Sequence, residues 1–277
     1  MKMKLFDYVE KDNCIYNLSG LTKTVCFLFL TFAAMLSYNI WCVGALLLFS
    51  LWIFKVSEIP FGKIKIMLIY VIVFLSINMV FTFLFSPLHG VELYGTYHEI
   101  FRFSDRYIVT QEQMLYLGTK AVKYSTIIPI GLILILTTNP SEFAASLNRV
   151  GCSYKGAYAV SLTLRYFPDL IREFQDISLA QQSRGLDLSK KEKLSTRVKN
   201  VINICVPLVF TTLDRIELIS NAMELRGFGK YKKRTWYSAK KLEKTDYAAM
   251  ILCGLIFAAI MGVAVFLDHS RFYNPFI

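Results

Sequence analysis

The sequence predicts an all-α membrane protein with about five transmembrane helices and a helical cytoplasmic domain inserted before the last of them. The chain is 55% hydrophobic and 18% charged, which is too apolar for an ordinary soluble protein of 277 residues. Several uncharged runs reach the length of about 18 residues that is typical of membrane spans. A long basic segment without any alternating strand pattern separates the last of these runs from the others.

The predicted spans follow the uncharged runs. Residues 66–86 form one span, and residues 247–267 form the last, beginning directly after Asp246. A further span covers residues 113–138, with Lys120 and Lys123 near its start. We expect these two long side chains to reach the lipid headgroups and to act as anchors.

Residues 24–54 allow two interpretations, because 31 residues are many for one span of about 20 and few for two. Lysine and arginine concentrate on the cytoplasmic side of membrane proteins. Two short spans, 24–38 and 40–54, place 26 of the 31 Lys and Arg residues inside, whereas one long span places 22 there. This distribution favours two spans in an N-terminal membrane domain of residues 1–138. The N-terminus is then cytoplasmic, and a tail of residues 268–277 lies outside the bacterial plasma membrane.

The insert, residues 139–246, carries 19 basic and 11 acidic side chains and is predicted to be helical and cytoplasmic. Its first helix has clear start and stop signals. Asn139 is a suitable N-cap, and Pro140 suits the first helical position because its missing N–H is not needed there. Gly151 can end this helix in the left-handed conformation.

Two longer helices follow in the insert. One is predicted from about residue 154 to 184, with a kink at Pro168, and the other from about residue 194 to 226, with a second proline at Pro207. Both are apolar on much of their surface. Long apolar helices in a basic insert indicate packing against the inner face of the membrane and against a partner.

These two helices end alike. A shift of 42 positions aligns Ile177, Ser178, Ala180, Arg184 and Gly185 with Ile219, Ser220, Ala222, Arg226 and Gly227. One Arg-Gly ending is ordinary helix-end chemistry, since arginine complements the helix dipole and glycine adopts the C-terminal turn. Two endings with a shared approach predict two guanidinium-bearing helix ends, suited to carboxylate sockets on a two-lobed cytosolic partner.

Residues 136–188 and 206–229 resemble the transmembrane T component of energy-coupling-factor transporters, the family that includes the membrane subunit of cobalt uptake systems. The family carries two Ala-Arg-Gly-type signatures on its coupling helices. Here they read Ser183-Arg184-Gly185 and Leu225-Arg226-Gly227, so both depart at the first position. The run "LRYFP", residues 164–168, is similar to the Arg-Phe-x-Pro stretch of the family.

The resemblance implies a non-catalytic scaffold without a cofactor of its own. Two ABC-type ATPase subunits would bind ATP and dock at the two Arg-Gly ends. A substrate-binding membrane protein, the S component, would capture a vitamin or a metal ion beside the spans. We expect Pro140, Arg165, Pro168 and Pro207 to act in hinging or packing of the coupling helices.

A stand-alone secondary transporter and an intramembrane enzyme are the alternatives. Secondary transporters usually place ionisable groups at mid-membrane, and the centres of the predicted spans lack charge. The acidic residues of the insert match no carboxylate-pair or metal-ligand spacing: Asp169, Glu173, Asp176 and Asp187. The scattered cysteines and histidines predict no metal site. The net charge of +11 follows from membrane topology, so no nucleic-acid partner is predicted.

Overall fold

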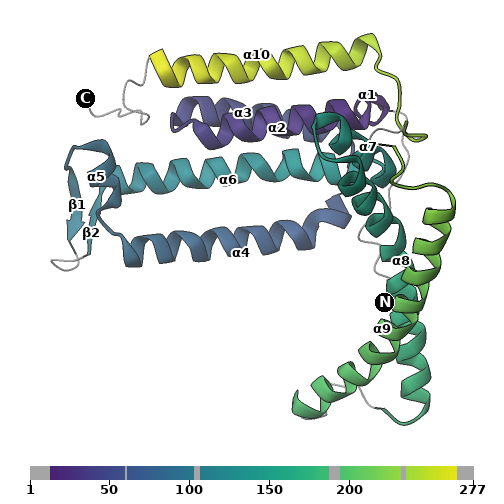
Figure 1. The fold of residues 1–277 in the computed structure, drawn as a ribbon. Coiled ribbons are helices and arrows are strands. Elements are labelled where there is room, and N and C mark those ends of the chain that lie inside the picture. Colours follow the sequence, from purple (N-terminus) through teal and green to yellow (C-terminus); the bar gives the residue numbers. More distant parts are fainter. Residues whose placement is uncertain (1–12, 60, 103–106, 187–193, 232–234, 267–277) are drawn as a thin grey trace. The chain divides into compact units, whose positions relative to one another are not determined.

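The computed structural model describes residues 13–59, 61–102, 107–186, 194–231 and 235–266 (Figure 1). This part of the chain is helical almost throughout, which confirms the predicted all-α class. Its contacts divide the chain into two compact units. The membrane unit comprises residues 1–139 and 240–277, and the insert unit comprises residues 140–239. The predicted external tail, residues 268–277, lies outside the described residues.

Among the described residues, three helices of the membrane unit are long and apolar enough to cross a membrane: α4 (Phe61–Phe85), through its segment Leu68–Phe85, α6 (Gln111–Thr137) and α10 (Lys244–Phe266). At about 1.5 Å per residue they extend about 35–40 Å, more than the roughly 30 Å of a hydrocarbon core. Their ends lie within a few residues of the predicted spans 66–86, 113–138 and 247–267.

Residues 24–54 contain two helices rather than one. Helix α2 (Gly20–Leu36) and helix α3 (Ile40–Val56) have 17 residues each and follow the short helix α1 (Cys14–Asn17). Each begins with a side-chain cap. The Ser19 hydroxyl accepts from the Thr22 N–H, and the Asn39 side-chain oxygen Oδ1 accepts from the Trp41 N–H. Both helices are about 25 Å long, which is short for a membrane span.

The segment between α4 and α6 contains structure that the sequence did not predict. Helix α5 (His89–Tyr94) is followed by an antiparallel pair of strands, β1 (Glu99–Arg102) and β2 (Ile108–Thr110). Two fully buried side chains at the start of α6 hold them. Glu112 Oε1 lies 2.7 Å from His98 Nδ1, and Gln113 Oε1 accepts from the Gly90 N–H at 2.8 Å.

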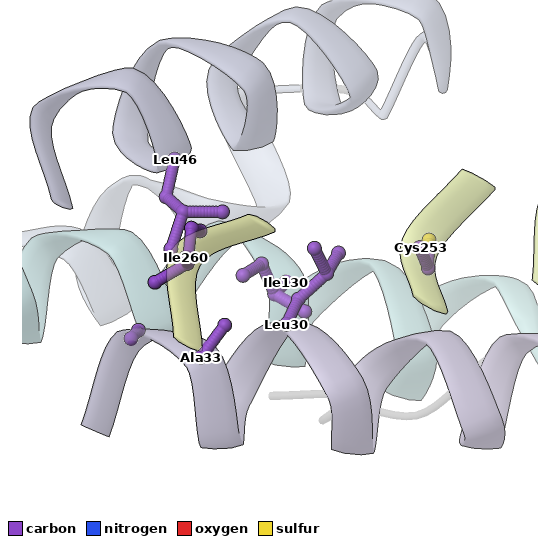
Figure 2. Close-up of a cluster of buried hydrophobic side chains, with 7 residues drawn as sticks. Leu30, Ala33, Leu46, Ile130, Cys253 and Ile260 are labelled. Carbon is purple, nitrogen blue, oxygen red and sulfur yellow. The ribbon is translucent and has the colours of Figure 1, made fainter. Parts of the chain in front are cut away.

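The core of the membrane unit lies among α2, α3, α6 and α10 (Figure 2). It consists of Leu30, Ala33, Ala34, Leu46, Ile130, Cys253 and Ile260. Ala33 and Ala34 have no exposed surface, and small side chains of this kind let helix backbones approach closely. The rings of Phe29 and Phe257, 5.7 Å apart, join α2 to α10 beside this core. Helix α10 is therefore packed on α2, its distant neighbour in sequence.

The expected headgroup anchoring is wrong for Lys123. Its residue surface is only 7% exposed, and its Nζ atom lies 3.6 Å from the centre of the Tyr38 ring. Tyr38 belongs to the turn between α2 and α3, and its ring attracts the ammonium group through a cation–π interaction. Lys120 donates to Thr82 Oγ1 on α4 at 2.8 Å, so it joins two helices.

The described part of the insert unit contains three helices, α7 (Pro140–Val150), α8 (Tyr154–Ser183) and α9 (Leu194–Leu225). Pro140 opens α7, as expected for a residue that lacks an N–H group. Gly151 ends α7 at a φ of +122°, in the region that favours glycine. With 30 and 32 residues, α8 and α9 are each about 45–48 Å long.

Candidate functional site

The first Arg-Gly ending closes α8 with a Schellman motif. Gly185 has a φ of +89°, which places it in the left-handed region. Its N–H donates to the Gln182 carbonyl at 3.0 Å, and the Leu186 N–H donates to the Gln181 carbonyl at 3.1 Å. This pair of bonds uses carbonyls that would otherwise lack a partner at the helix end.

The second ending repeats the same geometry at the end of α9. Gly227 has a φ of +69°, its N–H donates to the Glu224 carbonyl at 2.8 Å, and the Phe228 N–H donates to the Met223 carbonyl at 2.9 Å. The predicted glycine endings are thus present at both helices. Each helix stops one residue earlier than predicted, so Arg184 and Arg226 are the capping residues that follow the last helical residue.

Both arginines are exposed, but their neighbours differ. Leu225 is 89% exposed and presents an apolar side chain beside Arg226. At the first ending, the Ser183 hydroxyl donates to the Leu179 carbonyl at 3.0 Å and so turns back onto its own helix. The two surfaces therefore share a backbone shape and a cation, and they differ in the apolar area beside it.

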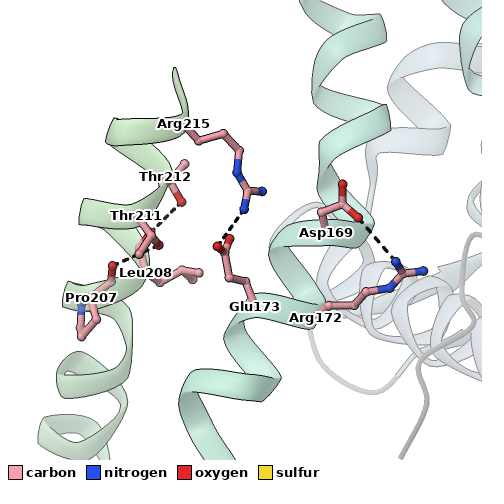
Figure 3. A network of polar contacts seen from close by, with 8 residues as sticks. All are labelled: Asp169, Arg172, Glu173, Pro207, Leu208, Thr211, Thr212 and Arg215. Atoms are coloured by element: carbon pink, nitrogen blue, oxygen red, sulfur yellow. Dashed lines mark hydrogen bonds and ion pairs between the residues drawn. The ribbon is translucent and has the colours of Figure 1, made fainter. Parts of the chain in front are cut away.

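Helices α8 and α9 run in opposite directions and contact each other (Figure 1). Arg215 of α9 pairs with Glu173 of α8 through an Nη2–Oε1 distance of 2.8 Å (Figure 3). The ring of Phe228, which follows the second ending, lies 4.8 Å from the ring of Tyr158 near the start of α8. The first ending lies at the far end of α8, so the two endings are separated by a helix about 45 Å long.

An aromatic cluster, Tyr154, Tyr158, Phe228 and Trp236, supports the second ending. Trp236 Nε1 also donates to Asn148 Oδ1 of α7 at 3.1 Å, which satisfies the polar atom of this half-buried ring. The sequence interpretation missed this cluster. Its signals are two tyrosines one helical turn apart and a phenylalanine directly after the second Arg-Gly pair.

The residues expected to hinge or pack the coupling helices do not gather in one place. Pro140 opens α7, exposed Arg165 and Pro168 lie on α8, and Pro207 lies on α9. Both long helices continue through their prolines, each of which lacks an N–H to donate to the preceding turn. After Pro207, Thr212 Oγ1 donates to the Leu208 carbonyl at 2.6 Å (Figure 3).

Two of the acidic residues that the sequence offered as candidates, Asp169 and Glu173, are partners in ion pairs. Besides the Glu173–Arg215 pair, Asp169 lies 3.6 Å from Arg172 one turn along α8 (Figure 3). Asp187 lies outside the described residues. Within the described ranges, no group of three His, Cys, Asp or Glu side chains could hold a metal ion.

Several curated relatives share one description. The chain is 30% identical to the energy-coupling factor transporter transmembrane protein EcfT of Macrococcus caseolyticus, over 92% of this chain and 95% of that protein. It is 26% identical to EcfT of Bacillus subtilis over 92% of this chain and 94% of that protein. EcfT of Leuconostoc gelidum is 35% identical over 50% of this chain, and the alignment spans 56% of that relative's length.

Several other matches are also partial. The chain spans 41% of an uncharacterised MG181 homologue of Mycoplasma pneumoniae and 50% of a Staphylococcus aureus EcfT. The family model described as cobalt transport protein, CbiQ, matches residues 11–237, which include both Arg-Gly endings and the helices that carry them. Because this match covers most of the sequence and both structural units, the chain belongs to the CbiQ family of cobalt transport proteins.

Proposed function

We propose that this chain is the energy-coupling membrane subunit of an energy-coupling-factor importer. In this role it is a non-catalytic scaffold, and ATP is bound and hydrolysed by two ABC-type ATPase subunits in the cytoplasm. Two relatives that align with this chain over almost their whole length are energy-coupling factor transporter transmembrane proteins, which supports the proposal. The cargo class is a vitamin or a metal ion, and the cobalt transport description of the family favours testing a metal ion first.

The observation that carries the proposal is the pair of matching helix ends. Arg184 and Arg226 both follow a helix that closes with a Schellman motif, and both are exposed. The two ends lie about 45 Å apart along one antiparallel helix pair, too far for a single small site. Guanidinium groups pair with carboxylates in a bidentate way, so each end suits an acidic socket on a separate ATPase.

The proposed mechanism uses the helix pair as a lever. When the ATPases bind ATP and close, they move the two helix ends that carry Arg184 and Arg226. Helices α8 and α9 move together, because the Glu173–Arg215 pair joins them. The substrate-binding S component, packed beside the chain in the bilayer, reorients in response and releases its cargo inside. The Lys and Arg distribution supports a cytoplasmic insert and N-terminus, with the C-terminus outside.

Charge reversal tests the docking step. We expect the double variant Arg184→Glu, Arg226→Glu to insert into the membrane normally and to lose co-purification with its ATPases. Each reversal places a carboxylate against an acidic socket, so repulsion replaces pairing. The single reversals are expected to give partial and unequal losses, because the residues beside the two arginines differ. Mass spectrometry of the complex purified in mild detergent measures the ATPase content.

The control is Arg172→Glu, which reverses another exposed arginine in the middle of α8. This variant is expected to retain its ATPases. Uptake of radioactive cobalt and of a panel of radiolabelled water-soluble vitamins by intact cells should fall in the double variant and stay at the wild-type level in Arg172→Glu. Normal ATPase content in the double variant would refute the proposed docking role of the two arginines.

A further inference from the structure

Two buried polar contacts lie where the chain leaves the membrane unit and where it returns. The chain leaves after Asn139 and returns at Lys240. On the leaving side, Lys23 Nζ donates to the Thr137 carbonyl at 2.7 Å and to the Tyr16 carbonyl at 3.2 Å. Thr137 is the last residue of α6, so this ammonium group lies at the negative end of a helix dipole.

On the returning side, a single carboxylate accepts hydrogen bonds at the N-termini of two helices. Asp246 Oδ1 accepts from the Ser19 N–H at 2.9 Å and from Thr22 Oγ1 at 2.8 Å, at the start of α2. Asp246 Oδ2 accepts from the Glu243 N–H at 2.9 Å, directly before the first residue of α10. The second bond has the form of a capping box, with the acid three residues after the cap.

The two contacts share the first turn of α2. Ser19, Thr22, Lys23, Thr137 and Asp246 are each at most 6% exposed, so their polar groups depend on one another rather than on water. The end of α6 and the start of α10 are therefore both hydrogen-bonded to a single helical turn. The backbone of the insert unit follows the end of α6 and leads back to the start of α10.

We propose that these five residues form a force-transmitting clamp, which we call the α2 clamp. The inference rests on the proposed energy-coupling function and deepens it by naming positioning residues within the membrane unit. Residues 138–139 and 240–243 join the insert to the membrane unit through the backbone, and they lead directly to the clamped helix ends.

The physical reason is the difference between directional and non-directional contacts. Below the clamp, α10 is packed on α2 by apolar side chains such as Cys253 and Phe257, and apolar contacts fix no register by themselves. The hydrogen bonds of Lys23 and Asp246 are charge-assisted and have defined donor and acceptor atoms. They keep the two helix ends at a fixed spacing, so displacement of the insert moves the helix bundle instead of fraying one helix end.

The test compares transport with ATP hydrolysis in the complete complex, purified with its ATPases and reconstituted in vesicles. The variants Thr22→Val and Lys23→Met remove the donating groups and keep side chains of similar size. We expect both to retain the ATPase content and the ATPase rate of the wild-type complex. Uptake per ATP hydrolysed should fall at least about fivefold, because a fivefold change corresponds to the low end of typical coupling free energies between two sites.

Exposed residues at the same end of the unit supply the controls. Thr245→Val matches Thr22→Val, and Lys55→Met matches Lys23→Met. The transported probe is radioactive cobalt or whichever radiolabelled vitamin the wild-type vesicles accumulate. Both controls are expected to keep the wild-type ratio of uptake to ATP hydrolysis.

Three results would overturn the clamp: an unchanged ratio in both variants, a parallel loss of uptake and ATP hydrolysis, or a failure to assemble with the ATPases. The second and third would mean that Lys23 and Thr22 only maintain the fold. Wild-type vesicles that bind no ATPase and accumulate none of the probes would contradict the proposed function itself, which separates the two failures.

Discussion

Alanine substitutions at the two helix-ending glycines test whether the shape of each ending is required for docking. Gly185 and Gly227 have φ angles of +89° and +69°, where a residue with a Cβ atom is strained. A Cβ built on either residue meets no atom within 4 Å, so the penalty comes from the backbone alone. The left-handed conformation costs an L-residue about 1–2 kcal/mol.

This penalty sets the expected size of the effect. A loss of about 1–2 kcal/mol lowers the population of the native ending relative to its alternatives by a factor of about 5–30. If the ATPases bind only the native ending, the affinity at each substituted ending falls in proportion to the native fraction, by up to the same factor. The Kd is measured by titrating the ATPase subunits that co-purify with the wild-type chain onto the immobilised, detergent-solubilised variants.

The control is Gly151→Ala, which also introduces backbone strain, at the end of α7, where φ is +122° and a Cβ again meets no atom within 4 Å. It should lower stability without weakening ATPase binding. Equal Kd values for wild type, Gly185→Ala and Gly227→Ala would refute the reasoning. An equal loss of affinity in Gly151→Ala would refute it as well, because strain anywhere in the insert unit would then be sufficient.

Two further substitutions test the helix pair itself. Arg215→Met leaves the half-buried Glu173 carboxylate without its guanidinium partner. We expect a loss of about 1–2 kcal/mol in stability, which lies between the values for exposed and for buried ion pairs. The loss is measured as a lower midpoint of thermal unfolding. An unchanged midpoint would mean that the pair does not join the helices. Phe228→Ala removes the ring contacts with Tyr154 and Tyr158, each worth about 0.5–1.5 kcal/mol, and should weaken ATPase binding at the Arg226 end only. Equal losses at both ends, measured in the Arg184→Glu and Arg226→Glu backgrounds, would contradict this.

The helix boundaries of the insert unit could be predicted because their determinants are local. Gly151, Gly185 and Gly227 each supply a left-handed residue at a helix end, and Pro140 supplies a fixed φ angle at a helix start. These preferences act within a few residues along the chain. The predicted ends therefore differ from those of α7, α8 and α9 by at most one residue.

The antiparallel pair of strands β1 and β2 and the helix α5 could not be predicted from local preference. Strands β1 and β2 have four and three residues, too few to give an alternating pattern. Their fold depends on His98 and Gly90 meeting Glu112 and Gln113 of α6 across 14 and 23 positions in the sequence. Such long-range partners are invisible to a periodicity argument.

The same limit applies to the buried charges. The sequence places Asp246 only at the boundary of the last span, although it also accepts from Ser19 and Thr22, which lie 227 and 224 positions away. Lys123 was interpreted as a headgroup anchor because its position on a single helix suggests one. The Tyr38 ring that covers it comes from the turn between α2 and α3, and only the packed bundle brings the two together.

The unlike neighbours of the two arginines bear on the symmetry of the proposed motor. Exposed Leu225 adds apolar area beside Arg226, whereas Ser183 adds none beside Arg184. An ATPase dimer of two identical halves would fit only one of these surfaces fully. A dimer with two different halves can match both, and it would then sit on the scaffold in a single orientation.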